Sequence, residues 1–373
     1  MKIVLTGGGS GGHFYPLIAV ARSIFKIAEV ERVAKVEIIL VSNDPMDKTL
    51  LDKEGIKFIK IPAGKIRRYF SLKNISDGIK TLSGVISSFF ILYKIMPDVI
   101  FGKGGYPAFP VLFAAKIFKI PVIIHETDSI PGVVNSWSGK WAKKIAVSFL
   151  ETTKFFDAKK VIVTGNPVRS QIVGGNLSEA LLHFKLEEGV PTILVLGGSQ
   201  GSAKINETIL DVLSELVLTY QIIHQTGEKN FSDVKGRSNV ILEKQPLKHR
   251  YHPFAFLNEG DLKNAGRVAS LAVSRSGGSI FEIAMWGIPS ILIPLPNAGR
   301  NHQRENAYNY AAKGACEVVE ETNLKPHILL SQINKILNDK EKIQKMSGAA
   351  KSFSRPDAAD AIAREVLKLG IHD

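Results

Sequence analysis

A short apolar strand that runs into a glycine-rich turn and then into a helix occurs twice in this chain. The first copy is residues 3–6 followed by Gly7-Gly8-Gly9-Ser10-Gly11-Gly12, and the second is residues 193–196 followed by Gly197-Gly198-Ser199-Gln200-Gly201. Each copy is typical of the first β–α unit of a Rossmann-like sheet, where backbone N–H groups at a helix N-terminus hold a phosphate. The chain is therefore predicted to be an α/β protein with two Rossmann-like parallel-sheet domains facing across a cleft. The two different glycine loops predict two different substrates.

Short apolar runs alternate with helical patterns along the whole sequence, which indicates parallel sheets buried on both faces. Strands are expected at residues 36–41, 98–101, 121–124, 161–164, 221–224, 240–242, 271–273 and 290–293. One helix is expected to carry Ile205, Ile209, Leu213, Leu216 and Val217 on a single side. The boundary is placed at Gly165-Asn166-Pro167, which ends a strand and begins a connection. The predicted domains are residues 1–165 and 166–355, with a C-terminal helix at 356–373 that packs back on the first domain.

Composition limits the class of protein. With 45% apolar and 22% charged residues, the 373-residue chain has the make-up of a globular protein with sizeable cores. Its single cysteine, Cys316, excludes an intramolecular disulfide and is compatible with a reducing compartment. No secretory signal pattern follows Met1, and no apolar run reaches the ~18 residues that span a bilayer. The chain is therefore expected to stay in the cytoplasm.

The formal net charge of +13 points to an anionic partner. Nucleic acid, an anionic membrane surface and phosphate-rich ligands all fit a basic protein. Nucleic acid is not expected, because the basic residues are scattered and no nucleic-acid-binding motif occurs. A generally basic, solvated surface is the alternative to any specific partner.

The first loop matches the dinucleotide fingerprint as Gly7-x-Gly9-x-x-Gly12, and Asp44 lies near the place of the acid that would bind a ribose. An NAD-dependent oxidoreductase is therefore one hypothesis. Two features argue against it: His13 puts an imidazole at the helix N-terminus, and a dehydrogenase does not need the second phosphate loop. His13 is a candidate general base or phosphate ligand, and a capping or packing histidine is the alternative.

Three further segments carry candidate residues. Lys103 adds charge to a glycine-rich turn at 102–107, and Glu126 ends the next strand as a candidate base or as part of a structural pair. Residues 274–282 are the most specific segment, because they follow a strand and open a helix. Glu282 lies about one turn into that helix, where its carboxylate would accept two ribose hydroxyls or simply face the helix dipole.

Taken in order, these motifs resemble the MurG family of peptidoglycan N-acetylglucosaminyltransferases, two-domain glycosyltransferases of the GT-B type. The resemblance covers nearly the whole chain. It rests on the segments 8–13, 102–106, His125-Glu126, 165–169, 197–201 and 275–282, and on His302-Gln303-x-x-Asn306-Ala307. Each motif alone is weak, and the ordered set is specific. One departure is Thr127-Asp128, which stands where the family often has Gln-Asn.

The resemblance implies transfer of N-acetylglucosamine from its UDP conjugate to the 4-hydroxyl of N-acetylmuramyl-pentapeptide-diphosphoundecaprenol (lipid I), giving lipid II. The transfer would invert the anomeric carbon, with no metal or other cofactor. His13 and Glu126 would be catalytic, with His13 near the reacting hydroxyl. The implied donor-binding residues are Ser10, Gly11, Gly12, Asp128, Arg169, Ser199, Leu257, Gly278, Ser279, Glu282 and Gln303. The implied acceptor-binding residues are Gly9, Gly104, Gly105, Tyr106 and His125.

A membrane-anchored acceptor implies a peripheral enzyme on the cytoplasmic face of the bacterial membrane. Residues at helical spacing predict an apolar face: Ile75, Ile79, Leu82, Val85, Ile86, Phe89, Phe90 and Tyr93. Basic residues surround it in sequence: Lys65, Arg67, Arg68, Lys73, Lys80, Lys94, Lys116 and Lys119. Such a helix binds anionic headgroups, unless the face packs in the core. The expected partners are UDP-N-acetylglucosamine, lipid I, an anionic membrane and other cell-wall synthesis proteins.

Three alternatives remain open on the sequence. The first is another nucleotide-sugar transferase of the same fold that acts on a lipid acceptor. The second is the NAD-dependent oxidoreductase, and the third is a non-catalytic module that binds polyanions.

Overall fold

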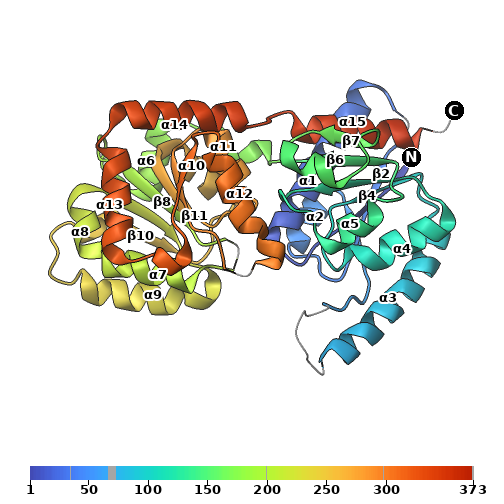
Figure 1. Ribbon diagram of the computed structural model, residues 1–373, viewed down its shortest axis with the longest axis horizontal. Helices are drawn as coiled ribbons and strands as arrows, with labels where there is room; N and C mark the ends of the chain where they lie inside the picture. Colours follow the sequence, from blue (N-terminus) through green and yellow to red (C-terminus); the bar gives the residue numbers. More distant parts are fainter. Residues whose placement is uncertain (34, 66–72, 199, 297, 372–373) are drawn as a thin grey trace. The chain divides into compact units, whose positions relative to one another are not determined.

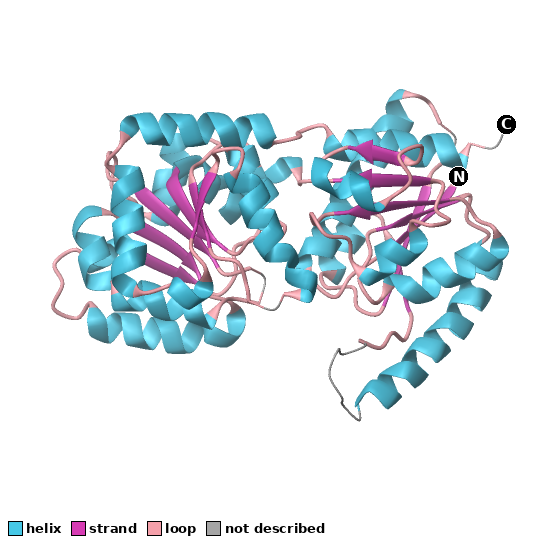
Figure 2. Cartoon of the chain, in the orientation of Figure 1, coloured by secondary structure: helices cyan, strands magenta, loops and turns pink. Residues whose placement is uncertain are grey.

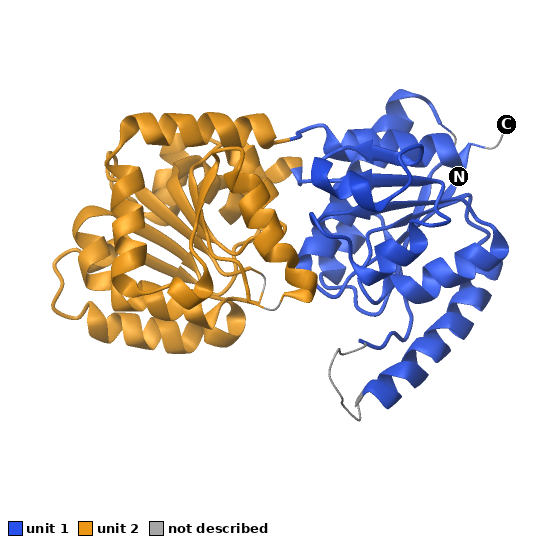
Figure 3. Ribbon diagram, viewed as in Figure 1, with its two compact units in different colours: residues 1–169, 355–373 blue, residues 170–354 orange. Residues whose placement is uncertain are grey.

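The computed structural model describes residues 1–33, 35–65, 73–198, 200–296 and 298–371. Ser199, Arg67 and Arg68, which carry sequence predictions, lie outside these ranges. The chain divides into two compact units, residues 1–169 with 355–373 and residues 170–354 (Figure 3). Each unit is a parallel sheet between layers of helices (Figure 2). The prediction of two Rossmann-like α/β domains is confirmed.

In the described part of the first unit, parallel strands form one sheet in the order β3-β2-β1-β4-β5-β6-β7. The strands are β1 (Lys2–Thr6), β2 (Glu37–Ser42), β3 (Lys57–Lys60), β4 (Val99–Gly102), β5 (Val122–Glu126), β6 (Lys144–Val147) and β7 (Val161–Val163). The helices are α1 (Gly11–Val30), α2 (Lys48–Lys53), α3 (Lys73–Ile95), α4 (Ala108–Phe118), α5 (Val133–Ser138), the 3₁₀ helix η1 (Leu150–Phe155) and α15 (Ala358–Gly370). Figure 1 labels most of these elements.

Both faces of this sheet are buried, as the apolar runs predict. Ile3 and Leu5 pack in one core cluster with residues of α1 and α15, while Val4 packs in another with residues of α4. Because successive side chains of a strand point to opposite faces, one short strand supplies both clusters. The last helix, α15, follows the second unit in sequence but belongs to the first unit, where Ile362 and Val366 are fully buried.

Helix α3 has its apolar side on the outside. The side chains of Ile75, Ile79, Leu82, Ile86, Phe90 and Tyr93 are 51–71% exposed. The opposite side buries Asp77, Gly84, Ser88 and Leu92. A Cβ on Gly84 would collide with the carbonyl oxygen of Pro62, so the glycine lets the helix lie directly on the backbone of the preceding segment. Three of these four buried residues are small or polar, whereas the large apolar residues of the opposite side lie in solvent.

Part of the predicted apolar face is packed rather than exposed. Val85 and Phe89 are half-buried, and the Phe89 ring lies 5.4 Å from that of Phe118 and 6.4 Å from that of Phe113. Within the described ranges, one helix, residues 74–95, is long and apolar enough to cross a membrane, with 22% of the tested window buried. No uninterrupted apolar run of that length occurs in the sequence, because Asp77 and Lys80 lie among the apolar residues of this helix.

In the second unit the described strands form a sheet in the order β10-β9-β8-β11-β12-β13. The strands are β8 (Thr192–Leu196), β9 (Gln221–Gln225), β10 (Tyr251–Phe254), β11 (Ala269–Ser274), β12 (Ser290–Leu292) and β13 (Cys316–Val318). The α-helices are α6 (Leu177–Phe184), α7 (Ala203–Asp211), α8 (Leu213–Thr219), α9 (Glu228–Ile241), α10 (Glu259–Val268), α11 (Ser279–Trp286), α12 (His302–Ala311), α13 (Pro326–Leu337) and α14 (Lys340–Phe353). The 3₁₀ helices are η2 (Ser170–Ile172), η3 (Lys248–Arg250), η4 (Gly299–Asn301) and η5 (Glu321–Asn323).

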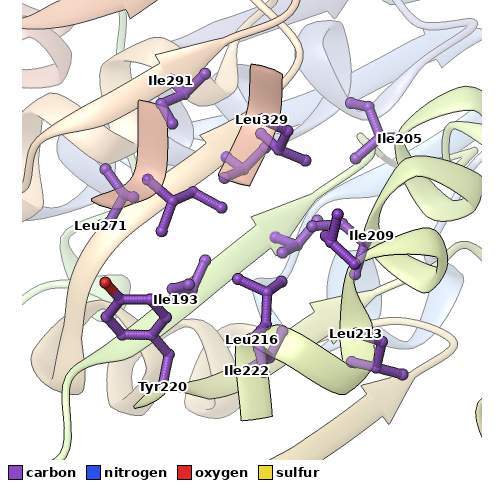
Figure 4. Packing of buried hydrophobic residues seen from close by; sticks show 14 of the residues in the cluster. Ile193, Ile205, Ile209, Leu213, Leu216, Tyr220, Ile222, Leu271, Ile291 and Leu329 are labelled. Atoms are coloured by element: carbon purple, nitrogen blue, oxygen red, sulfur yellow. The ribbon is translucent and has the colours of Figure 1, made fainter. Parts of the chain in front are cut away.

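The core on one face of this second sheet is aliphatic. Ile193 of β8 and Ile222 of β9 pack with Ile209 of α7, Leu216 of α8 and Leu329 of α13 (Figure 4). All five side chains are fully buried. This packing fixes β8 and α7 against each other, and the second glycine loop joins them.

Two expectations for the second unit were wrong. Residues 240–242 are not a strand: Val240 and Ile241 end helix α9, and Val240 is 75% exposed. A run of three apolar residues does not distinguish a strand from a helix end. The helix expected to carry Ile205 through Val217 is two helices, because the backbone of Val212 leaves helical geometry between α7 and α8.

Candidate active site

The predicted residues of the first unit follow the carboxyl ends of its strands. Residues 7–10 follow β1, residues 103–106 follow β4, residues 127–128 follow β5 and residues 164–169 follow β7. Because the strands are parallel, these four segments lie at one edge of the sheet. In open α/β sheets, this edge is where ligands bind.

The first two glycine-rich segments pack directly on one another. Gly9 and Gly105 have positive φ angles of 82° and 79°. A Cβ on Gly105 would lie 2.9 Å from the carbonyl oxygen of Gly8, and a Cβ on Gly9 would lie 3.0 Å from the Tyr106 ring. Asn43 donates to the Tyr106 hydroxyl at 3.0 Å and holds that ring in place. The structure therefore brings together Gly9, Gly105 and Tyr106.

Helix α1 begins directly after the first loop. Ser10 is its N-cap residue, yet its side chain accepts no hydrogen bond from the first turn. Instead, Ser10 Oγ lies 3.0 Å from His13 Nδ1. The N–H groups of Gly11 and Gly12 precede the first bond of the helix, which the N–H of His13 donates to the Ser10 carbonyl at 3.1 Å, and they carry the partial positive charge of the helix. Ser10, Gly11, Gly12 and His13 thus form a helix N-terminus suited to an anion.

His125 lies at the end of β5 and is fully buried. Its Nε2 lies 3.0 Å from the Gly165 carbonyl oxygen. Burial, with a smaller contribution from Lys103, holds the pKa of His125 well below its usual value. The ring is therefore neutral at pH 7, and it donates from Nε2 to Gly165. Among the described groups, none hydrogen-bonds its Nδ1.

Glu126 is 4% exposed and holds the next loop in shape. Its carboxylate accepts hydrogen bonds from the N–H of Asp128 at 3.0 Å, the N–H of Gly132 at 2.9 Å and Asn135 Nδ2 at 2.9 Å. Asn135 also lies under Gly104, where a Cβ would come within 2.8 Å of its amide nitrogen. Burial raises the pKa of Glu126, and the neighbouring Asp128 raises it further. These contacts suit a residue that positions the loop of Asp128.

Arg169 is the last residue of segment 164–169, which follows β7. Its guanidinium lies 3.7 Å from the centroid of the Tyr15 ring, and Tyr15 is in the first turns of α1. A guanidinium stacked on an aromatic face keeps its planar fork in one orientation. Arg169 is 4% exposed.

The second unit has a similar edge. Ser199 lies outside the described residues, but the loop around it is described on both sides. Gly201 has a φ of 74°, and a Cβ there would collide with the Thr226 carbonyl oxygen. Ser202 caps α7 by accepting from the N–H of Ile205 at 3.4 Å. The loop is thus pressed against the end of β9 and leads straight into a helix N-terminus.

Gln225, at the end of β9, joins the second glycine loop to another predicted residue. Its Nε2 donates to the Gly198 carbonyl at 3.1 Å, and its Oε1 accepts from the N–H of Leu257 at 3.0 Å. Leu257 is fully buried. Sequence reasoning did not select Gln225, although it ends an apolar strand just before Thr226-Gly227.

The loop after β11 is fixed by the segment after β12. Ser276 Oγ donates to the Gln303 carbonyl at 2.7 Å, and Asn306 Nδ2 donates to the Ser276 carbonyl at 3.1 Å. The Gln303 side chain accepts from the N–H of Leu295 at 3.0 Å, and its Nε2 comes within 3.9 Å of a Cβ built on Gly277. Gln303 is therefore brought next to the start of α11.

Helix α11 carries the last predicted donor residues. Gly278 is its N-cap residue, Ser279 Oγ donates to the Arg275 carbonyl at 3.2 Å, and Glu282 is half-buried in the first turn. The structure thus groups Leu257, Gly278, Ser279, Glu282 and Gln303 with the second glycine loop at one edge of the second sheet.

Two other observations bear on the chemistry. Asp44, the acid that a dinucleotide site would require, is exposed and accepts from the N–H of Met46 at 2.7 Å in a local turn. Within the described ranges, no group of three or more His, Cys, Asp or Glu side chains is arranged to hold a metal ion.

Two α/β units, each with a glycine-rich loop and a helix N-terminus at its strand ends, define the architecture of a nucleotide-sugar glycosyltransferase. Residues 3–147 match the glycosyltransferase family 28 N-terminal domain, and residues 192–362 match the family 28 C-terminal domain. The chain belongs to this family.

Curated relatives agree with this assignment. The chain is 37% identical to the UDP-N-acetylglucosamine–N-acetylmuramyl-(pentapeptide) pyrophosphoryl-undecaprenol N-acetylglucosamine transferase of Thermodesulfovibrio yellowstonii, covering 97% of both chains. It is 34% identical to the enzyme of that name from Listeria welshimeri, covering 98% of this chain and 99% of the relative.

Solved structures share the fold. The crystal structure of Acinetobacter baumannii MurG has a TM-score of 0.73 at 25% identity, covering 98% of this chain and 99% of the other. A UDP-GlcNAc 2-epimerase from Neisseria meningitidis, bound to UDP-GlcNAc, has a TM-score of 0.69 at 17% identity over 99% and 100% of the two chains. The second likeness concerns the fold alone.

Proposed function

We propose that this protein transfers N-acetylglucosamine from UDP-N-acetylglucosamine to the 4-hydroxyl of lipid I and so forms lipid II. The observation that carries the proposal is full-length identity of 34–37% to transferases named for this reaction. The grouping of the motif residues at the carboxyl edges of both sheets supports it. The oxidoreductase is not favoured, because the Asp44 carboxylate is engaged in a local turn.

The second unit would bind the donor. Glu282, in the first turn of α11, would accept hydrogen bonds from the two ribose hydroxyls. Gln303 would contact the sugar, and the Leu257 backbone would face the uracil. The N-termini of α7 and α11 would meet the charge of the diphosphate with N–H groups. Ser199 and Arg169 would assist there, as would Ser10, Gly11, Gly12 and Asp128.

The first unit would bind the acceptor at its packed glycine loops, through Gly9, Gly104, Gly105 and Tyr106, with His125 holding the β5 end. His13 would act as the general base. With a proton on Nδ1 donated to Ser10 Oγ, the lone pair of the neutral imidazole would be on Nε2, which would take the proton of the 4-hydroxyl. The deprotonated oxygen would attack C1 of the sugar from the face opposite UDP. The C1–O bond to UDP would break with inversion, and UDP would leave as the anion.

The proposal is tested by incubating the purified chain with labelled UDP-N-acetylglucosamine and a soluble lipid I analogue. The expected product is the disaccharide lipid, with UDP released in equal amount. Glu282→Ala is the variant that should lose donor binding, and Glu341→Ala in the first turn of α14 of the same unit is a matched control, because the Glu341 side chain is 76% exposed. Saturable binding of NADH without binding of UDP-N-acetylglucosamine would overturn the proposal. Transfer to a different lipid acceptor only would favour another glycolipid transferase.

The first unit would also contact the membrane, through the exposed apolar side of α3. Six large apolar residues on that side are more than half exposed, and Met96 and Ile117 nearby are 69% and 57% exposed. Lys80, Lys94, Lys116 and Lys119 are exposed around them. An apolar helix face with basic flanks binds at the interface of an anionic bilayer. The enzyme would then be peripheral on the cytoplasmic face, where lipid I is anchored.

A further inference from the structure

Lys103 is buried to an unusual degree for a charged side chain. At 1% exposure it is the least exposed of the Lys, Arg, Asp and Glu side chains in the described ranges. It follows β4 in the middle of the first sheet, directly under the first glycine loop. A Cβ on Gly7 would lie 2.9 Å from the Cβ of Lys103, and the N–H of Lys103 donates to the Thr6 carbonyl at 2.8 Å.

The Lys103 side chain connects several strand ends. Its Nζ donates to Thr127 Oγ1, after β5, and to Asn166 Oδ1 at 3.4 Å, after β7. Thr127 Oγ1 in turn donates to Asn166 Oδ1 at 3.3 Å. The Lys103 ammonium therefore links the loop after β4 to the loops after β5 and β7.

Neither acceptor of this ammonium is a carboxylate. The nearest acids flank Thr127 in sequence, and the Glu126 carboxylate is occupied by three N–H donors of its own. Burial lowers the pKa of Lys103 to about 8, although the charges of Glu126 and Asp128 act in the opposite direction. Burying a cation without a bonded anion costs several kcal/mol. The positive charge of Lys103 is therefore not neutralised in the fold, and it can attract an anionic ligand.

We propose that Lys103 is a positioning residue for the anionic diphosphate of the acceptor. Its ammonium orients Thr127 and Asn166 and adds fixed positive potential beneath the first glycine loop and the N-terminus of α1. The inference rests on the proposed function, in which the first unit binds a diphosphate ester. Lys103 acts through these neighbours, because it is too deeply buried to touch the ligand itself.

The first test compares Lys103→Met with Lys53→Met. Both changes remove one positive charge, but Lys53 is exposed on α2. At pH 7 the Lys103 variant should raise the KM for a soluble lipid I analogue at least tenfold, while the Kd for UDP-N-acetylglucosamine stays unchanged. Lys53→Met should match the wild type in both values. A folded Lys103→Met variant with a wild-type acceptor KM would overturn the inference.

Two further measurements have readouts in Thr127→Val and in the wild type, and Lys103→Met serves in them only as a comparison. Thr127→Val removes an acceptor of the ammonium and should raise the acceptor KM severalfold, with little added effect when combined with Lys103→Met. In the wild type, the acceptor KM should rise between pH 7 and 9.5 as Lys103 loses its proton, and this rise should be absent in Lys103→Met. The groups that face Lys103 electrostatically, Glu126, Asp128 and His125, are all retained in Lys103→Met, so the difference between the two pH profiles isolates Lys103. A wild-type KM that is flat with pH, or an unaffected Thr127→Val, would overturn the inference.

The failure of the proposed function has a different signature. If the wild type neither binds nor uses a lipid diphosphate acceptor, the proposed function is wrong. If the wild type uses the acceptor and the variants behave like it, only the role of Lys103 is wrong.

Discussion

Removing two apolar side chains from the exposed side of α3 should release the protein from anionic vesicles without unfolding it. Ile79 and Phe90 are 66% and 71% exposed, so replacing both with serine removes little that packs in the fold. Phe89 is the wrong choice for this test. Its ring packs on Phe113 and Phe118, and serine there would leave a cavity.

The size of the effect follows from the exposed fractions. Complete burial of an Ile or Phe side chain contributes about 1.5 to 3 kcal/mol, so burying the exposed two-thirds contributes roughly 1 to 2 kcal/mol for each. The double variant should then lose roughly 2 to 4 kcal/mol of membrane binding. At 1.4 kcal/mol for each factor of ten, the partition constant should fall roughly 30- to 700-fold.

Sedimentation with vesicles of mixed anionic and zwitterionic lipid measures this constant. Leu182→Ser is the matched control, because Leu182 is 80% exposed on α6 of the second unit. The loss should persist at high salt, since it comes from apolar burial, and turnover on a water-soluble acceptor should stay normal. If the folded double variant binds vesicles as tightly as the wild type, the membrane contact lies on another surface.

Glu282→Ala should weaken UDP-N-acetylglucosamine binding by roughly 2 to 4 kcal/mol, because two ribose hydroxyls lose a charged acceptor; unchanged calorimetric affinity in a folded variant would remove Glu282 from the donor site. His13→Ala should lower turnover on a soluble acceptor roughly 100-fold or more, with donor affinity little changed, whereas wild-type turnover would exclude His13 as the base. Burial lowers the pKa of His224 to about 3. Below pH 6.5 the unfolded chain therefore binds a proton at His224 that the folded chain does not bind. The stability that is present above pH 6.5 is lost as the pH falls toward 3. Urea unfolding at pH 7 and pH 5 should show about 2 kcal/mol of this loss, and His224→Gln should show a smaller difference between the two pH values; equal differences would exclude His224 as the source.

The glycine loops were predictable because their chemistry is local. A glycine-rich turn between an apolar strand and a helix has few other structures to adopt, and parallel strands then bring separate loops to one edge. The strand at 240–242 failed for the opposite reason. Three apolar residues fit a strand and a helix end equally well, and the surrounding helix decided between them.

The side chains that hold the loops could not be predicted in the same way. Lys103 can be buried because its ammonium donates hydrogen bonds to Thr127 and Asn166, which are 24 and 63 residues away in sequence. Periodicity predicted the apolar stripe of α3 but not which way it faces. That depends on Gly84, whose missing side chain lets the polar side of the helix lie on the backbone at Pro62.

The return of α15 to the first unit sets the order in which the protein can mature during synthesis. The first 169 residues leave the ribosome without the helix that covers part of α1, because that helix is made only after the whole second unit. At a synthesis rate of about 5 to 20 residues per second, the gap is roughly 10 to 40 s. During that time the apolar surface that will receive Ile362 and Val366 stays open on the nascent chain. Holdase chaperones therefore have a target on this protein while the second unit is being made, and a ribosome that stalls just after residue 354 leaves a product whose second unit is finished and whose first is not.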